Sequence, residues 1–426
     1  GSEMSNLAHM QIDPPPMPDE EALAAPVMKP VPRITIHAFC EHPETGSVIQ
    51  RAGEDRRLSK AHLTVHMGGM RAAAEFYQQT ATPNLILVET LAGGNEVFGH
   101  LASLAEVCDA GTKVVVLGHL NDVSVYSEMI RQGVNEYLVT PLSPIQIIEA
   151  VSRLYVDPDA PPIGRSIAFM GAKGGTGSST IAHNVGWCIS TRMNEDVIIT
   201  DLDLAFGTAG LDFNHDPAQG IADALMAPER LDDVLLDRLL VKCSDHLSLF
   251  AAPAVLDRDL DMDSESFESV LEIVRETVPC VIVDLPHIWS PWTKKLLMSA
   301  DEIVITATPD LASLRNAKNI IDLAKQMRSN DGMPHLVINQ VGVPKRPEIP
   351  VKDFAEAIGL EPTLVLPFNP GLFGAAANNG QMIEELDSKN KATEGMRYLA
   401  KQLCGRDPMP IKATKKSFLQ RLARKG

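Results

Sequence analysis

Short runs of apolar residues alternate with amphipathic stretches between residues 33 and 160. One stretch with helical periodicity, residues 123–132, is followed by Gly133, a residue type that often ends helices. Apolar strands separated by helices predict a parallel sheet covered on both faces, so we expect a flavodoxin-like α/β domain here. Four runs have the length and the β-branched content of buried strands: residues 34–39, 85–88, 114–117 and 136–139.

A second series of strand patterns begins after a polar, proline-rich connector, residues 157–162. Its first strand is followed by a glycine-rich turn and then by a helical pattern over residues 181–190. We expect a second α/β domain with a mostly parallel sheet over residues 161–405, after a first domain over residues 33–160. The runs that predict its strands are residues 166–170, 197–203, 303–310 and 336–340.

The two ends of the chain differ from the domains in composition. Residues 1–32 hold several prolines and little apolar periodicity, so they cannot bury enough surface to offset the entropy of ordering, and we expect a disordered leader. Residues 406–426 are expected to form a basic amphipathic tail. No apolar run approaches the roughly 18 residues of a membrane-spanning helix and no signal-peptide pattern is present, so we expect a cytoplasmic protein.

The charge of the chain limits its partners. Its 426 residues include 38 Lys and Arg against 55 Asp and Glu, which gives a formal net charge of −17. Proteins that bind phosphate backbones without specificity usually carry a basic surplus, so we expect no general affinity for nucleic acid. Residues 411–426 are the exception, because they contribute +6 to the total of −17 and leave −23 for the rest of the chain.

The glycine-rich turn has the features of a phosphate-binding loop. Residues 171–180 are Gly-Ala-Lys-Gly-Gly-Thr-Gly-Ser-Ser-Thr and stand between a predicted strand and a predicted helix. In this context backbone N–H groups and the positive end of the helix converge on one point, which suits an anion. Gly174, Gly175 and Gly177 would let the backbone approach phosphate oxygens closely.

This segment resembles the deviant Walker A box of the MinD/ParA family of P-loop NTPases, Lys-Gly-Gly-x-Gly-Lys-[Ser/Thr]-[Ser/Thr]. The resemblance implies ATP and Mg²⁺ as cofactors, with Lys173 as the catalytic signature lysine that reaches a partner subunit's phosphates. It also implies Ser179 as a Mg²⁺ ligand and Thr176 and Thr180 as nucleotide-binding residues. Ser178 stands where the family has a second lysine, which removes a charge that stabilises phosphoryl transfer. We therefore expect ATP binding with at most slow hydrolysis.

Acidic residues near two predicted strand ends fit the same family, whose resemblance spans about residues 163–405. Asp201 and Asp203 resemble the first switch, which implies Asp201 near Mg²⁺ and Asp203 as the catalytic residue that orients water. Asp284 resembles the Walker B carboxylate of the metal site. Asn339 and Pro367 match elements that bind or cover the adenine base, and the Asn339 amide can both donate and accept. A solvated strand end or a helix cap is the alternative for each acid, and a turn residue is the alternative for Asn339.

The first domain resembles the receiver domain of response regulators. In that family a strand-end aspartate accepts phosphate beside Mg²⁺, and Glu89 occupies the matching position here. Thr140 replaces the usual lysine before Pro141, and Gly118 replaces the usual hydroxyl residue. A glutamate reaches about one methylene further and the balancing cation is absent, so we infer a receiver-shaped module without phosphoacceptor chemistry. Another small flavodoxin-like domain is the alternative.

An atypical receiver followed by a MinD/ParA-like domain resembles the CpaE/TadZ branch of the family. The resemblance implies a localisation and assembly factor of a type IVb (Flp/Tad) pilus machine, which works beside the motor ATPase of that machine in the cytoplasm or at a cell pole. ATP would join two copies into a homodimer. Two other functions stay open: a ParA-type ATPase that partitions DNA or protein cargo, and a signalling protein of the response-regulator kind.

The tail resembles the C-terminal membrane-targeting helix of MinD. Phe418, Leu419 and Leu422 fall on one helical face, with basic residues around them. An ATP-bound homodimer would bring two such tails to the inner membrane and gain by avidity, so we expect peripheral membrane contact through residues 411–426. A disordered basic tail without membrane contact is the alternative.

Overall fold

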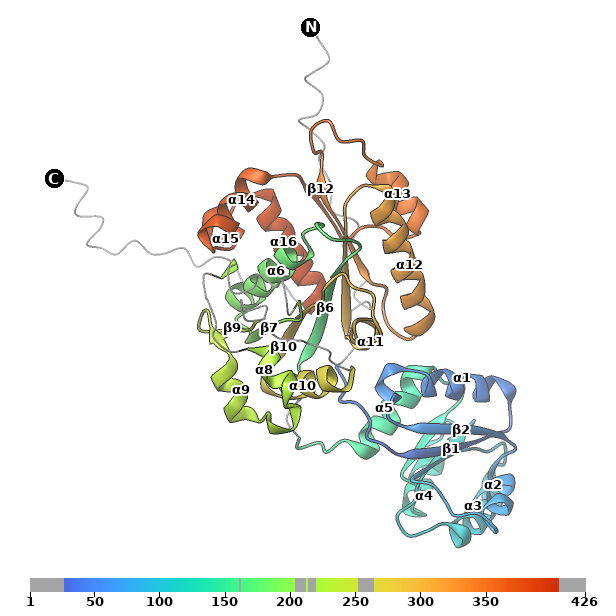
Figure 1. Ribbon diagram of the computed structural model, residues 1–426. Helices are drawn as coiled ribbons and strands as arrows, with labels where there is room; N and C mark the ends of the chain where they lie inside the picture. The colour runs from blue at the N-terminus through green and yellow to red at the C-terminus, as the bar shows by residue number, and fades with distance from the viewer. Residues whose placement is uncertain (1–26, 161, 204–211, 214–219, 252–263, 406–426) are drawn as a thin grey trace, which may run out of the picture.

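Two sheets organise the chain, a five-stranded one in the N-terminal lobe and an eight-stranded one in the C-terminal lobe. Figure 1 shows the N-terminal lobe, in blue and cyan, below the larger C-terminal lobe. The predicted tail and most of the predicted leader lie outside the described residues. The computed structural model describes residues 27–160, 162–203, 212–213, 220–251 and 264–405.

The N-terminal lobe contains a parallel sheet in the order β2-β1-β3-β4-β5, which is the order of flavodoxin-like folds. This confirms the predicted fold class. The strands are β1 (Thr35–Cys40), β2 (His62–Met67), β3 (Leu85–Glu89), β4 (Lys113–Gly118) and β5 (Glu136–Val139). The helices are α1 (Pro43–Gly53), the short 3₁₀ helix η1 (Arg56–Leu58), α2 (Met70–Phe76), α3 (Gly94–Val107), α4 (Val123–Arg131) and α5 (Pro144–Tyr155).

Both faces of this sheet are covered, as the continuous apolar strands predict. One core cluster contains residues of α1 and α5, and a second contains residues of α2, α3 and α4. β2 has no counterpart among the predicted strands. Because it is an edge strand with only intermediate or exposed side chains, it lacks the apolar run that reveals the other four.

The C-terminal lobe contains a sheet in the order β13-β12-β11-β6-β10-β7-β9-β8, parallel except for β8. The strands are β6 (Arg165–Gly171), β7 (Val197–Asp201), β8 (Val241–Lys242), β9 (Leu247–Phe250), β10 (Cys280–Asp284), β11 (Glu302–Ala307), β12 (His335–Val341) and β13 (Leu364–Pro367). The helices are α6 (Ser178–Arg192), α8 (Ile221–Met226), the 3₁₀ helix η2 (Pro228–Arg230), α9 (Asp233–Leu239), α10 (Ser264–Thr277), α11 (Pro291–Ser299), α12 (Leu311–Met327), α13 (Val351–Ile358), α14 (Pro370–Asn379), α15 (Ile383–Leu386) and α16 (Lys391–Cys404).

Helices cover both faces of the large sheet, and the helix that follows β6 is itself mostly buried. α6 packs against β6, β7 and β10 on one side and against α16 on the other. This enclosure fixes the first turn of α6 at the carboxyl edge of the sheet, where ligands bind in open α/β folds. Among the described residues no helix is both long and apolar enough to span a bilayer.

Candidate nucleotide-binding site

The predicted phosphate loop lies at the carboxyl end of β6 and leads into α6. Gly175 and Gly177 have φ angles of +79° and +83°, a region that residues with a side chain rarely adopt. An added Cβ at Gly177 would lie 2.6 Å from the Nδ2 atom of Asn339. At Gly174 it would lie 3.2 Å from the ring of His287, so the loop after β10 contacts the phosphate loop. Backbone angle and close neighbours therefore both require glycine at position 177.

Two amide side chains at the end of β12 hold this loop. The Nδ2 of Asn339 donates to the carbonyl of Thr176 at 2.9 Å, and the Nε2 of Gln340 donates to the carbonyl of Gly175 at 3.0 Å. Asn339 is buried together with Thr176. A contact between Asn339 and an adenine base stays a prediction, since its amide nitrogen already binds the loop. Gln340 was not predicted as a site residue, and its φ of +57° becomes visible only in the structure.

The first turn of α6 presents three hydroxyl side chains, as the sequence predicts. The Oγ of Ser178 is buried and has no hydrogen-bond partner among the described residues. Buried hydroxyl groups are normally satisfied, and the N–H groups of a helix start also lack intrahelical partners. An unsatisfied hydroxyl beside such N–H groups suits an incoming phosphate oxygen. The loop and the start of α6 therefore fit the phosphate group that the sequence predicts.

Lys173 lies beside the loop and is bound within its own chain. Its Nζ is 2.9 Å from the Oδ2 of Asp310, the residue that caps α12 by accepting from the N–H of Ser313. Burial alone would raise the pKa of Asp310. The hydrogen bonds from Thr308, Ser313 and Lys173 have a larger and opposite effect, so the pKa of Asp310 lies below its usual value. The lysine expected to reach a partner's phosphates is thus held by a local carboxylate in this structure.

The carboxylates predicted to face a metal lie together. Asp284 and Asp201 are register neighbours at the ends of β10 and β7, and both are buried. The Oγ of Ser179 donates to the Oδ1 of Asp284 at 3.1 Å. The backbone N–H of Asp203 donates to the Oδ1 of Asp201 at 3.0 Å. Hydroxyl and carboxylate oxygens are ligands that suit Mg²⁺, so this donor set fits the predicted metal.

No group of three His, Cys, Asp or Glu residues with metal-binding geometry occurs within the described ranges. A Mg²⁺ ion here would therefore rely on the Ser179 hydroxyl, a carboxylate and non-protein oxygens, in agreement with the preference of Mg²⁺ for water and phosphate ligands. The segment after Asp203, including Gly207 of the predicted first switch, lies outside the described residues.

A buried histidine that sequence reasoning did not single out orients the Asp284 carboxylate. The Nε2 of His183 is 3.1 Å from the Oδ2 of Asp284, and its Nδ1 is 2.5 Å from the Oδ2 of Asp212. Burial lowers the pKa of His183, but the two hydrogen-bonded aspartates raise it to about 10. At neutral pH the ring is therefore protonated and both nitrogens donate. One sequence signal could have pointed to His183. It lies one helical turn after Ser179, so both side chains are on the same face of α6.

Three large apolar side chains are exposed around the phosphate loop. Ile288 and Trp289 lie in the loop after β10, and Leu311 begins α12 after β11. Their exposed fractions are 57%, 49% and 64%. Because β6 lies between β10 and β11, these residues flank the phosphate loop, and we call them the apolar rim. Pro367, predicted near the base, is exposed at the end of β13.

Glu89 of the N-terminal lobe uses its carboxylate to hold the start of α1. One oxygen accepts from the N–H groups of Glu41 and His42 at 2.7 and 2.8 Å. The other accepts from the Thr45 hydroxyl at 2.7 Å and lies 3.3 Å from the Nδ1 of His42. The side chain is buried. Both oxygens are therefore engaged, which supports the inference that this position lacks phosphoacceptor chemistry.

Glu89→Gln is expected to lower the free energy of unfolding of the N-terminal lobe by about 1–3 kcal/mol at pH 7, since it weakens charge-assisted hydrogen bonds. Burial raises the pKa of Glu89, but hydrogen bonds from His42, Thr45 and Glu41 lower it to a value below its usual range. Such a group stabilises above its unfolded pKa and loses that contribution as pH falls through its folded pKa. Thermal unfolding should therefore separate variant from wild type at pH 7 and less so below about pH 4.

Glu44→Gln is the matched control for this prediction, because Glu44 is an exposed acid in the first turn of the same helix. It should change the unfolding temperature little at either pH. Equal unfolding of Glu89→Gln and wild type at pH 7 would contradict the structural role of the Glu89 carboxylate.

Comparisons with known proteins agree with this geometry. A family model described as an AAA domain matches residues 164–337, a range that includes the phosphate loop and Asp284 but ends before Asn339. The septum site-determining protein MinD of Synechocystis sp. is 24% identical over 273 residues, which cover 62% of this chain and 98% of that protein.

Two solved structures resemble different shares of the chain. The crystal structure of a ParA family ATPase from Chlorobium tepidum is 25% identical and covers 55% of this chain and 98% of its own, with a TM-score of 0.51. The crystal structure of the pilus assembly protein CpaE from Caulobacter crescentus is 53% identical and covers 30% of this chain and 98% of its own, with a TM-score of 0.30.

Proposed function

Because the chain belongs to the CpaE family of pilus assembly proteins, we propose that it is a localisation and assembly factor of a type IVb (Flp/Tad) pilus machine. In this proposal it binds ATP, dimerises on doing so, and hydrolyses ATP slowly or not at all. The observation that carries it is the phosphate loop, whose glycine geometry is intact while the buried, unpartnered Ser178 hydroxyl stands where a lysine is expected.

Backbone and hydroxyl groups of residues 174–180 would hold the phosphates of ATP. Asn339 and Gln340 keep the loop carbonyls turned toward β12, which leaves the opposite side of the loop for the ligand. Ser179 and Asp284 would hold Mg²⁺, and the hydrogen bond from His183 fixes the direction of the Asp284 carboxylate. Bound ATP would supply an anionic triphosphate, which the backbone N–H groups of the loop and the positive end of α6 can stabilise.

The dimer would form across the face that bears the phosphate loop. Lys173 lies on this face with 39% of its side chain exposed, so it can exchange Asp310 for a phosphate of the partner. The apolar rim lies on the same face, and exposed apolar groups around a polar site are typical of protein interfaces. Because ATP would bind the dimer and not the separate copies in this way, its binding would shift the equilibrium toward the dimer.

The proposed partners follow from the family. A long-lived ATP dimer would present a composite surface to the motor ATPase or other assembly proteins of the pilus machine at a cell pole. Peripheral contact of residues 411–426 with the inner membrane stays part of this proposal, supported by their sequence pattern alone.

ATP with Mg²⁺ is expected to convert the full chain from monomer to dimer, and Trp289→Asp is expected to weaken that dimer at least about thirtyfold. A buried aromatic residue at an interface centre commonly contributes about 2 kcal/mol or more, and an aspartate there would also have to be desolvated. Analytical ultracentrifugation measures the dimer, and calorimetry measures ATP binding to each protein. Trp289→Asp should still bind ATP as a monomer.

Tyr126→Asp is the matched control, because Tyr126 is an aromatic residue of similar exposure that lies in α4 of the N-terminal lobe. It should dimerise like wild type. Failure of the wild-type chain to bind ATP would overturn the proposed function, whereas an unaffected dimer of Trp289→Asp would exclude only this face as the interface.

A further inference from the structure

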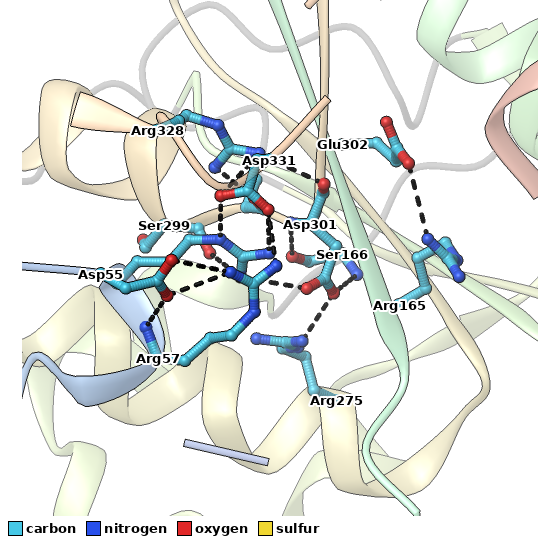
Figure 2. A network of polar contacts seen from close by, with 12 residues as sticks. Asp55, Arg57, Arg165, Ser166, Arg275, Ser299, Asp301, Glu302, Arg328 and Asp331 are labelled. Carbon is cyan, nitrogen blue, oxygen red and sulfur yellow. Dashed lines mark hydrogen bonds and ion pairs between the residues drawn. The ribbon is translucent and has the colours of Figure 1, made fainter. Parts of the chain in front are cut away.

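The two lobes meet at a charged contact that lies far from the phosphate loop. The turn Asp55–Arg57, at the start of η1, extends from the N-terminal lobe to Asp301, Asn330 and Asp331 of the C-terminal lobe. Figure 2 shows the labelled side chains Asp55 and Arg57 beside Asp331 and Asp301. We call these residues the interlobe contact.

Asp331 is the centre of the interlobe contact. Its carboxylate accepts two hydrogen bonds from Arg56, at 3.1 and 3.0 Å, in the forked arrangement that guanidinium groups favour. Arg57 adds a third at 2.6 Å and uses its other nitrogen to bind Asp55 at 3.0 Å. Asn330 closes the ring by donating to Asp55 at 3.0 Å. Specific geometry, and not charge alone, therefore joins the lobes.

A second set of bonds ties this contact to the framework of the large sheet. Arg56 also donates to the Asp301 carboxylate at 3.1 Å, and Asp301 accepts from Arg275 at 2.7 Å and from the N–H of Ser166 at 2.9 Å. Arg328 donates to the carbonyls of Met298 and Ala300, near the end of α11, at 2.7 and 2.5 Å. The contact is thereby attached to β6, to the end of α11 and to the end of α12.

Burial makes the interlobe contact sensitive to the loss of any partner. The side chains of Arg57, Asp55 and Asp331 are each only 3% exposed. Removing one member of a buried ion pair leaves the other charge uncompensated, which is strongly unfavourable. We therefore expect two main states, one with the interlobe contact complete and one with the lobes separated. States with a partly broken contact would leave a buried charge unpaired.

α11 and α12 connect the interlobe contact with the nucleotide site. α11 begins directly after the loop that holds Ile288 and Trp289 and ends at Ser299, whose carbonyl accepts from Arg56. α12 begins after Asp310, the partner of Lys173, and ends shortly before Asn330 and Asp331. In Figure 1 the lower end of α12 faces the N-terminal lobe. Each helix thus has one end at the phosphate loop and the other at the lobe boundary.

We propose that the interlobe contact is a latch through which the receiver-like lobe holds α11 and α12 in the arrangement that pairs Asp310 with Lys173. The proposal rests on the proposed function, because Lys173 must leave Asp310 before it can reach a nucleotide. Helix α12 is fixed at both ends in the latched state. Opening the latch frees one end, lowers the cost of releasing Lys173, and by linkage ATP binding favours the open latch.

Two variants of the full chain test the latch, Asp331→Asn and Arg56→Ala. Both should increase the radius of gyration in X-ray scattering, because the lobes separate. Without nucleotide, hydrogen exchange of residues 171–180 and 308–316 should rise about fivefold or more, the lower end of typical couplings between sites. ATP with Mg²⁺ should bind about fivefold more tightly to the variants. If Asp331→Asn fails to fold, Arg56→Ala decides, since it leaves Asp331 paired with Arg57.

Lys60→Ala is the control, because the pair between Lys60 and Glu272 also joins the lobes but is exposed and 3.7 Å long. It should change none of these quantities. Lobes that separate without faster exchange near the phosphate loop would overturn the latch, and so would lobes that stay together in both variants. The hydrogen-exchange measurement needs no ATP. If the wild-type chain binds no ATP, the proposed function is refuted, but the exchange rates of the variants still test the latch.

Discussion

Gly177→Ala is expected to weaken ATP binding at least about tenfold. At a φ of +83° a residue with a side chain is strained by about 1–2 kcal/mol, and 1.4 kcal/mol corresponds to a tenfold change in affinity. The new Cβ would also lie 2.6 Å from the Nδ2 of Asn339, which must then move away from the Thr176 carbonyl. The loop would relax from its phosphate-binding shape, and restoring that shape would oppose binding.

Calorimetry with ATP and Mg²⁺ measures this loss, with circular dichroism to establish that the variant is folded. Gly374→Ala is the matched control, because Gly374 lies in α14 with open space around its Cβ position. It should bind ATP like wild type. Tight binding by Gly177→Ala would mean that the phosphates bind elsewhere.

The alternation of apolar runs and helical patterns predicts most of the strands because central strands of parallel sheets are buried on both faces. It also predicts the phosphate loop, since glycine, hydroxyl and lysine residues are adjacent in the chain there. The resemblance to the MinD/ParA family implied Asp201 and Asp284 near one metal ion, and the parallel strands that carry them do end at the same edge of the sheet. These features depend on local sequence or on regular topology.

The features that sequence reasoning missed depend on contacts between distant residues. His183 has the sequence surroundings of an ordinary helix residue, and its two aspartate partners become apparent only when α6 and β10 are packed. The pairing of Lys173 with Asp310 joins two loops that are more than one hundred residues apart. Arg56 and Arg57 have the sequence signature of a solvated basic pair, yet Arg57 is almost fully buried against the other lobe.

Ser178→Lys is expected to raise ATP turnover about tenfold to a hundredfold. Groups that stabilise the charge developing in a transition state commonly contribute factors of about 10²–10³, and a long side chain on the first turn of α6 can extend toward the phosphates. The residues predicted to bind Mg²⁺ and to orient water are already nearby, since Ser179 contacts Asp284 and Asp203 follows the end of β7. Phosphate release at saturating ATP and Mg²⁺ measures the turnover.

Ser178→Met separates charge from size in this experiment. Methionine is also long and unbranched, so it displaces the buried serine hydroxyl without adding a cation. If charge limits hydrolysis, the lysine variant gains turnover and the methionine variant does not. Equal turnover of wild type and Ser178→Lys, with ATP still bound, would mean that another feature keeps hydrolysis slow; the in-chain pairing of Lys173 with Asp310 is then the first to test, by Asp310→Asn in the Ser178→Lys background.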